Sequence, residues 1–264
     1  MLVGLLAFGA ITSFPTEVRA QAKNPVGKLY VASVTGESII NRGSKLEALN
    51  VKSSYVAEGS VIETKPKASN AMVLSNGTGL YLDSDSRLEI QKFAQEPFAA
   101  GRTDLEVEPS RSQTEAFVVR GSLGVCTGKL VAGSSLKYST SLAALSTQNA
   151  RLVIESTPEY TRISVLDGDG LIRGGPLDTV GHMLHAGEQA IIRPGAPNEP
   201  NPITVSKIND RDRALAEEST FAACAARKTV YFETSGEDNS DVRAVPVVPE
   251  TLPVPITVSP SRLP

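Results

Sequence analysis

The chain has 264 residues, of which 41% are hydrophobic and only 5% aromatic, with no tryptophan. This length is enough for one large or two small domains, with a core built from Val, Ile, Leu and Ala. The formal net charge of −3, without any long run of Lys and Arg, argues against the basic surface that nucleic-acid-binding proteins need.

Residues 1–22 are typical of an export signal. Residues 2–11 form an apolar stretch, and Ala20-Gln21-Ala22 fits a small-residue cleavage site, although no Lys or Arg precedes the apolar stretch. A buried N-terminal strand is the alternative interpretation. The stretch is shorter than the roughly 20 apolar residues of a membrane-spanning helix, and no later stretch is long enough. We therefore expect a periplasmic or secreted protein with no transmembrane helix once the signal is removed.

The middle of the chain is typical of short β-strands separated by Gly, Asn, Asp and Ser. Leu88 and Ile90 alternate with polar neighbours, as on a half-buried sheet face. Residues 27–40 predict a pair of strands with Gly36 at the turn, and Asn76-Gly77 predicts a second hairpin. Further strands are expected at residues 61–63, 71–74, 79–82, 88–93, 116–119, 123–126, 135–139, 151–155, 161–166, 170–173 and 189–193.

This regular spacing of strands predicts the fold class. Strands that recur every eight to twelve residues or so, with turn residues between them, favour a sandwich, barrel or solenoid over βαβ units. We expect an all-β fold, an elongated β-sandwich or a β-solenoid-like domain over residues 28–195. A polar stretch at residues 97–113 is expected to be a long surface loop.

One helix is expected after the β domain, at residues 206–228, followed by a short strand at 230–232. Either Ser206 or Asn209 is positioned to cap the helix, with acidic residues near its start and basic residues near its end. The predicted apolar side consists of Ile208, Leu215, Phe221 and Ala222. Residues 236–264 are rich in proline, which predicts a disordered tail or tether.

The two cysteines leave two interpretations open. Cys126 lies in an apolar strand and Cys224 on the small-residue side of the expected helix. An oxidising compartment permits a disulfide between them. Sequence does not establish the required proximity, and two separate buried thiols are slightly favoured.

The candidate ligand-binding motifs are weak. His182 and His185 lack the further ligands of a metal site, so they are expected to be solvated loop residues. The Asp167-Gly168-Asp169 and Asp83-Ser84-Asp85 segments are similar to the start of a calcium loop, but lack its terminal Glu and flanking helices. Both are expected to be β-turns. The sequence thus predicts no metal and no cofactor.

No motif for catalysis is recognisable. There is no Gly-x-Ser-x-Gly elbow and no phosphate-binding Gly-rich loop, and Cys126 is expected to be buried and inert. Glu106 and Glu108 alternate with apolar residues, which predicts a solvated strand face. We therefore expect a protein that is not an enzyme and has no catalytic residues.

Several turn and strand motifs follow one another in a defined order along roughly residues 28–195. They lie at residues 34–36, 59–64, 69–77, 80–82, 86–90, 119–123, 163–168 and 184–188. In this order they resemble the FecR domain, a periplasmic module. Its motifs are glycine turns and apolar strand positions, such as Val119-Arg120-Gly121-Ser122-Leu123.

The resemblance implies a role in binding or signalling. FecR proteins sense an outer-membrane receptor and control a sigma factor through a membrane span and a cytoplasmic segment, neither of which is recognisable here. We therefore expect a stand-alone module that binds an envelope protein or polymer, with exposed sheet edges as the contact surface. The alternative is a structural or adhesive envelope protein that binds cell-wall polymer or carbohydrate. The scarcity of aromatic residues argues against sugar stacking.

Overall fold

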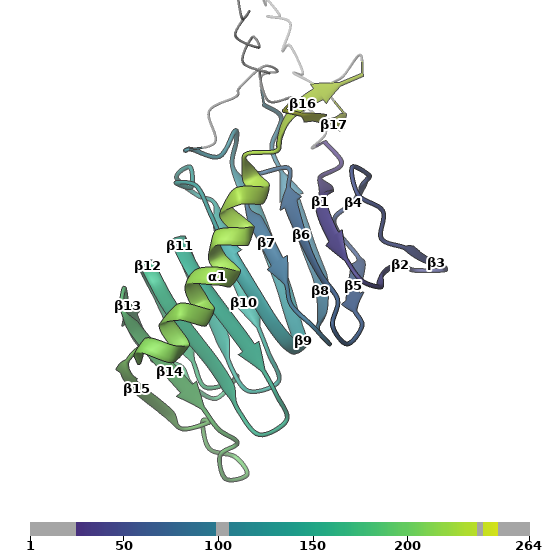
Figure 1. Ribbon diagram of the computed structural model, residues 1–264. Helices are drawn as coiled ribbons and strands as arrows, with labels where there is room; N and C mark the ends of the chain where they lie inside the picture. Colours follow the sequence, from purple (N-terminus) through teal and green to yellow (C-terminus); the bar gives the residue numbers. More distant parts are fainter. Residues whose placement is uncertain (1–24, 99–105, 237–239, 248–264) are drawn as a thin grey trace, which may run out of the picture.

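The fold is all-β with a single helix in the part of the chain that is described, which confirms the predicted class (Figure 1). The computed structural model describes residues 25–98, 106–236 and 240–247. The predicted export signal therefore lies outside the described residues. The strands are β1 (Lys28–Thr35), β2 (Ser38–Arg42), β3 (Lys45–Ala48), β4 (Ser54–Val56), β5 (Ser60–Thr64), β6 (Ser69–Leu74), β7 (Gly79–Leu82), β8 (Arg87–Gln95), β9 (Ser112–Cys126), β10 (Ser135–Ser139), β11 (Ala144–Ser156), β12 (Thr161–Arg173), β13 (His182–His185), β14 (Glu188–Ile192), β15 (Ile203–Lys207), β16 (Val230–Ser235) and β17 (Asp241–Pro246); the helix is α1 (Asp210–Arg227).

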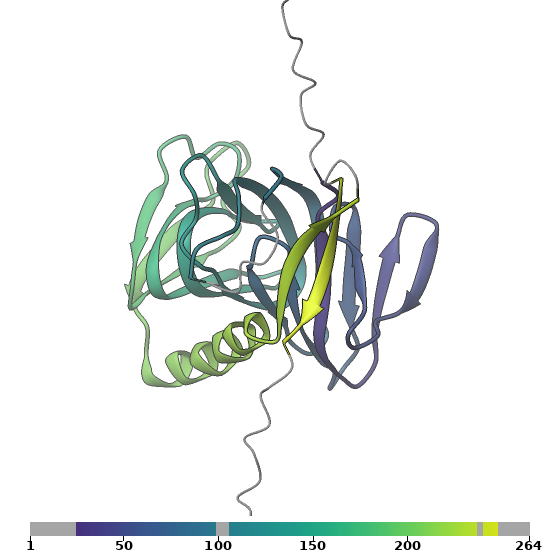
Figure 2. The same ribbon diagram turned by 90° about the horizontal axis from the view of Figure 1, so that it is seen from above.

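Fifteen of the strands form one sheet that folds into two layers, and three long strands belong to both. The first half of β9 pairs with β8 and β10, whereas its second half pairs with β7 and β11. In the same way β11 and β12 pair with each other along both layers. The sheet curls around its own interior, and α1 lies outside it (Figure 2). This arrangement is closer to a sandwich than to a solenoid.

Two glycines mark the corners where shared strands pass from one layer to the other. Gly121 in β9 has φ +84°, and Gly168 in β12 has φ +81°, both in the left-handed region that glycine adopts without strain. A Cβ at Gly168 would lie 1.9 Å from the carbonyl oxygen of Asn149. The corners therefore need glycine both for backbone conformation and for space.

These corners correct part of the strand prediction. The expected strands at residues 116–119 and 123–126 are one strand, β9, and those at 161–166 and 170–173 are likewise one strand, β12. The predicted β-turn at Asp167-Gly168-Asp169 is therefore wrong, since it is a bulge inside β12. The turn predicted at Asp83-Ser84-Asp85 is confirmed between β7 and β8, where Asp85 has φ +51°.

Of the two predicted hairpins, one is confirmed and the other is wrong. Strands β6 and β7 pair in antiparallel fashion around Asn76-Gly77, where Gly77 has φ +83°. In contrast, β1 and β2 are consecutive but unpaired. Strand β1 pairs with β4 and β6, whereas β2 pairs with β3 and β5. The turn at Gly36 therefore leads the chain from one layer to the other.

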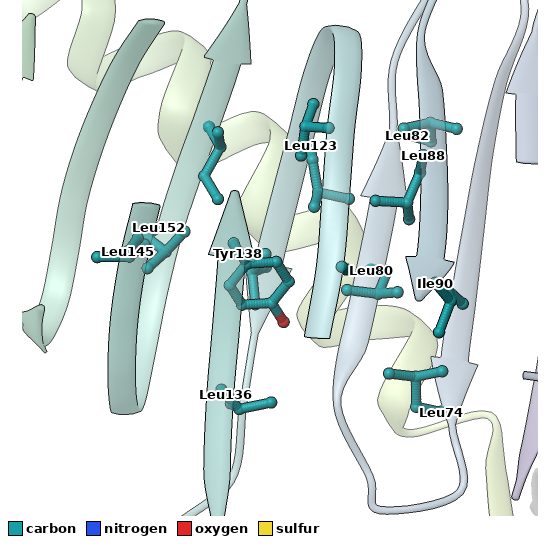
Figure 3. Close-up of a cluster of buried hydrophobic side chains, with 14 of the residues drawn as sticks. Leu74, Leu80, Leu82, Leu88, Ile90, Leu123, Leu136, Tyr138, Leu145 and Leu152 are labelled. Carbon is teal, nitrogen blue, oxygen red and sulfur yellow. The ribbon is translucent and has the colours of Figure 1, made fainter. Parts of the chain in front are cut away.

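The core between the layers consists of aliphatic side chains, as the composition predicts. Figure 3 shows residues from both layers meeting in one cluster around the buried ring of Tyr138. Leu80 and Leu123 are 1% and 0% exposed, and Leu152 and Leu136 are buried with them. At about 25 cal/mol per Å² of buried apolar surface, such a cluster is the main source of stability for the scaffold.

Helix α1 packs across the outer face of the layer that contains β6, β7, β9, β11 and β12 (Figure 1). Asn209 is the N-cap, because its side chain accepts a hydrogen bond from the backbone N–H of Asp212 at 2.9 Å. Ser206, the other predicted cap, lies in β15.

The predicted apolar face of this helix is wrong. Leu215 and Phe221 are 54% and 76% exposed, and Ala222 is only partly buried. Ile208 is buried but precedes the helix. The buried helical positions are small ones: Ala216, Ser219, Thr220, Ala223 and Ala226.

A disulfide joins this helix to the sheet. Cys126 at the end of β9 and Cys224 in α1 are bonded, with their Cα atoms 5.2 Å apart. The preference for two separate buried thiols is thus wrong. Next to the disulfide, Nε of Arg227 donates to the carbonyl oxygen of Gly77 at 2.6 Å, and burial lowers the pKa of this guanidinium. The helix is therefore held both covalently and by a partly buried cation.

Part of the predicted tail is ordered. Residues 241–246 form β17, which pairs with β16 in a separate two-stranded sheet. This sheet packs through Val230, Phe232 and Val242 on a second small core that includes Tyr30 and Val73. The rest of the predicted disordered tail, residues 237–239 and 248–264, lies outside the described residues.

Candidate interaction surface

The two histidines do not form a site together. Both lie in strand β13 and are exposed, rather than in the predicted loop. Their separation of three places them on opposite faces of the strand. His185 instead contacts Asp169, with Nδ1 2.7 Å from Oδ1. Across the described residues, no three His, Cys, Asp or Glu side chains are grouped in a way that could hold a metal ion.

Among the residues singled out in the sequence, Glu108 differs most from its predicted exposure. Its carboxylate is 2% exposed rather than part of a solvated face, whereas Glu106 is exposed. Oε2 accepts from Oγ of Ser112 at 2.9 Å, and Oε1 accepts from the backbone N–H of Val131 at 2.7 Å and from Oγ of Ser134. The predicted surface loop at 97–113 therefore contains a buried anchor within its described part.

These hydrogen bonds form a directed network. Nδ2 of Asn76 donates to Oγ of Ser112 at 3.0 Å, and the backbone N–H of Ser112 donates to Oγ of Ser134 at 3.0 Å. Both hydroxyls in turn donate to Glu108. Burial raises the pKa of the Glu108 carboxyl, although the three hydrogen bonds oppose the rise. The network joins the β6–β7 hairpin to the segments that flank β9 and β10, which is a structural role.

Strand β15 is an exposed edge of the large sheet, and the sequence did not predict it. It pairs only with β14 among the described strands. Its three consecutive β-branched residues, Ile203, Thr204 and Val205, are the signal that could have identified it.

The phase of the hydrogen bonds shows which backbone groups of this edge are free. The N–H of Ile208 donates to the oxygen of Gly187 at 3.0 Å, and the N–H of Arg193 donates to the oxygen of Pro202 at 3.3 Å. Bonded pairs alternate along an antiparallel ladder, so the backbone groups of residues 204 and 206 face β14. The N–H and C=O groups of residues 203, 205 and 207 point away from the sheet.

A groove of about 660 Å³ runs between α1 and the outer face of the sheet. Arg162 of β12 lies at one end, with Nη1 3.2 Å from Oε2 of Glu155 and 3.5 Å from Oδ1 of Asp212. Its guanidinium carbon also lies 5.2 Å from the centre of the Tyr160 ring. This end of the groove is therefore a compact ion-pair network that fixes the start of α1 on the sheet.

Asp212 is the centre of that network. Its Oδ2 accepts from Nε2 of Gln189 at 3.1 Å and from Nδ2 of Asn209 at 2.8 Å. The hydrogen bond from Gln189 is the main reason that the pKa of the Asp212 carboxyl lies below its usual value, with Asn209 and Arg162 adding to the effect. The carboxylate thus stays charged over the groove.

At the other end of the groove two further carboxylates, Asp83 and Glu218, line the wall beside Tyr81 and Leu215. The N–H of Asp83 donates to the oxygen of Ser122 at 3.1 Å, which fixes the turn after β7. Together, the groove and the β15 edge offer binding contacts.

Comparison with known proteins adds little. No family model matches the sequence, and no curated protein matches it either. Two crystal structures from Parabacteroides distasonis, each described as a candidate anti-sigma factor, show a distant likeness to the fold. One is 13% identical to this chain, with a TM-score of 0.41. The similar region covers 58% of this chain and 62% of that protein, so this chain spans less than two thirds of that protein's length. The other is 10% identical with a TM-score of 0.41 and covers 71% of this chain and 99% of its own.

Structural similarity this low does not support a statement about the function of this chain. The FecR resemblance accordingly stays a prediction. Among the described residues, the structure contains no helix with both the length and the apolar character that a membrane crossing demands.

Proposed function

We propose that this protein is an exported, non-enzymatic module of the FecR-like kind that binds a protein partner in the cell envelope and serves in signalling. The partner adds a strand to the free edge of β15. The observation that carries the proposal is the outward row of backbone groups at residues 203, 205 and 207 on a rigid two-layer scaffold. Unpaired edges of this kind bind extended peptides through main-chain hydrogen bonds.

The disulfide between Cys126 and Cys224 supports the exported location. Such bonds persist in oxidising compartments and are rare in the cytosol. Residues 1–22 fit a cleaved leader, so the mature chain is expected to begin at Lys23. Cell fractionation and the mass of the mature N-terminus test this part. Recovery of an uncleaved chain from the cytosol would contradict it.

The edge is tested with two substitutions at one position. Val205→Pro removes the outward N–H without removing a bond to β14, whereas Val205→Thr keeps the N–H and changes the side chain. Each variant is used to capture partners by cross-linking in envelope extract of the organism that encodes the chain. One defined protein should be recovered with the wild type and Val205→Thr, and lost with Val205→Pro.

Two outcomes would contradict this proposal. Equal recovery of the protein partner by Val205→Pro would exclude β15 as the contact. Retention on cell-wall polymer alone would favour the structural or adhesive alternative. Matching thermal unfolding curves of the two variants would show that the scaffold is intact in both.

A further inference from the structure

The groove beside α1 has one end whose charges are neutralised and one whose charges are not. At the first end, Arg162 pairs with both Glu155 and Asp212, and Arg211 also lines the groove there and acts on Asp212. At the second end, Asp83 and Glu218 face the groove, and neither makes an ion pair within the described part of the chain. The groove is thus acidic at one end only.

The same end also has apolar walls. Leu215 is 54% exposed on the helix side, and Tyr81 forms part of the floor on the sheet side, next to Ala216. A Cβ at Gly124, which pairs with Tyr81, would lie 2.8 Å from the carbonyl oxygen of Ser219, so the helix backbone lies close to the floor here. Glu218, the residue before Ser219, therefore lies beside the floor and lines the same groove as Asp83.

We propose that this end of the groove accepts a lysine or arginine side chain of a protein partner. A long basic side chain combines an aliphatic stem, which packs against Leu215 and the Tyr81 ring, with a cationic head, which reaches the carboxylates of Asp83 and Glu218. The charge of this end is complementary to such a cation, whereas the opposite end already contains two cations of the chain, Arg162 and Arg211. This inference goes beyond strand addition at β15 and does not depend on it.

The test uses a capped amino acid as the probe. The full chain, labelled with ¹⁵N, is titrated with N-acetyl-lysine methylamide and with the norleucine analogue, which keeps the stem but carries no charge. Backbone amide shifts should change at Tyr81, Ser122 and Ala216 with the lysine probe, and less with norleucine. Raised salt should weaken the lysine probe selectively, because exposed charges are screened.

Two double variants, one in the groove and one elsewhere on the surface, change the net charge of the chain by the same amount. Asp83→Asn with Glu218→Gln removes both groove carboxylates, whereas Glu159→Gln with Glu199→Gln removes two exposed carboxylates elsewhere. The dissociation constant of the lysine probe should rise about three- to tenfold in the first pair of substitutions and stay unchanged in the second.

Three results would overturn the inference. They are shifts that map outside the groove, equal binding of the norleucine probe, and unchanged lysine binding after removal of Asp83 and Glu218 charges. The norleucine comparison uses the wild-type chain, so it decides the matter even if the groove variant does not fold. Loss of the β15 contact in Val205→Pro leaves this result unaffected.

Discussion

Ala223 of the helix lies directly over Gly79 of the sheet: a Cβ at position 79 would lie 2.1 Å from the carbonyl oxygen of Ala223. Real Cβ atoms do not approach a backbone oxygen so closely. The pair therefore explains why the buried side of α1 is made of small residues, and why its two large apolar residues, Leu215 and Phe221, lie outside the helix–sheet contact.

Substitution of Gly79 by alanine should lift the helix from the sheet. The added methyl group meets backbone rather than a movable side chain, so the free energy of unfolding should fall by about 1–3 kcal/mol. Phe221→Ala is the control, because an exposed side chain usually changes stability by less than about 0.5 kcal/mol. Urea denaturation of both variants measures the difference. A larger loss in Phe221→Ala would mean that the outer face of the helix packs against something.

Loss of the disulfide should destabilise the chain strongly. The bond between Cys126 and Cys224 closes a loop with a sequence separation of 98 residues. In the chain-entropy description a loop of this length contributes about 4–5 kcal/mol. The double variant Cys126→Ala, Cys224→Ala should lose most of that free energy of unfolding.

Reduction provides the control for this prediction. Dithiothreitol should lower the stability of the wild type toward that of the double variant and leave the double variant unchanged. If reduction left the free energy of unfolding of the wild type unchanged, helix packing alone would be holding α1 in place.

Local patterns predicted the strands well because side chains alternate wherever one face is buried. Residues 79–82 and 135–139 were predicted with the bounds that β7 and β10 have. The hairpin at Asn76-Gly77 followed from turn chemistry alone. The helix cap at Asn209 was likewise one of two local choices.

The errors arise where tertiary contacts decide. A glycine that permits a turn also permits a bulge, so the sequence predicts strand ends at Gly121 and Gly168, although the strands continue through both glycines. The partners of β1 are β4 and β6 rather than β2, its neighbour in sequence, because strand pairing depends on distant residues. The buried side of α1 depends on how closely Gly79 lets it approach, and Leu215 gives no local sign of this.

The candidate site was even less predictable. The groove combines residues from β7, β9, β11, β12 and α1, which no single segment reveals. Glu108 occurs in an alternating polar stretch that is typical of a solvated strand, and only the fold brings Ser112, Ser134 and Val131 around it.

Removal of the Glu108 side chain should destabilise the fold strongly, whereas its replacement by glutamine should be tolerated. Glu108→Ala leaves the N–H of Val131 and two hydroxyls without their acceptor, at a cost of about 2–4 kcal/mol. Glu108→Gln keeps an acceptor oxygen for Val131 and Ser134 and should cost less than half as much. Glu115→Gln, on the surface, is the control.

The same carboxyl should affect the pH dependence of stability. Burial raises the pKa of Glu108 in the folded chain above its ordinary value, so the folded state binds the proton more tightly than the unfolded state. The free energy of unfolding should therefore decrease as pH rises from about 4.5 through the folded pKa. Glu108→Gln should remove this part of the slope. An unchanged slope would indicate that the carboxyl is not buried in solution.

Asp212 should contribute a pH dependence of the opposite sign. The hydrogen bond from Gln189, together with Asn209 and Arg162, holds its pKa below the ordinary value, so the folded state binds the proton less tightly than the unfolded state. Its contribution is fully present above the unfolded pKa of about 3.9 and is lost as pH falls through the lower, folded pKa. Asp212→Asn should therefore flatten the decline of stability below about pH 4.

The measurement is acid unfolding of the wild type and Asp212→Asn, with the carboxyl of Asp212 followed by NMR titration. Gln189→Ala is the matched variant, because it removes the main donor but leaves the carboxylate, and it should raise the pKa of Asp212 toward the usual value. If Gln189→Ala leaves that pKa unchanged, then Asn209 and the ion pair with Arg162 hold the start of α1 without it.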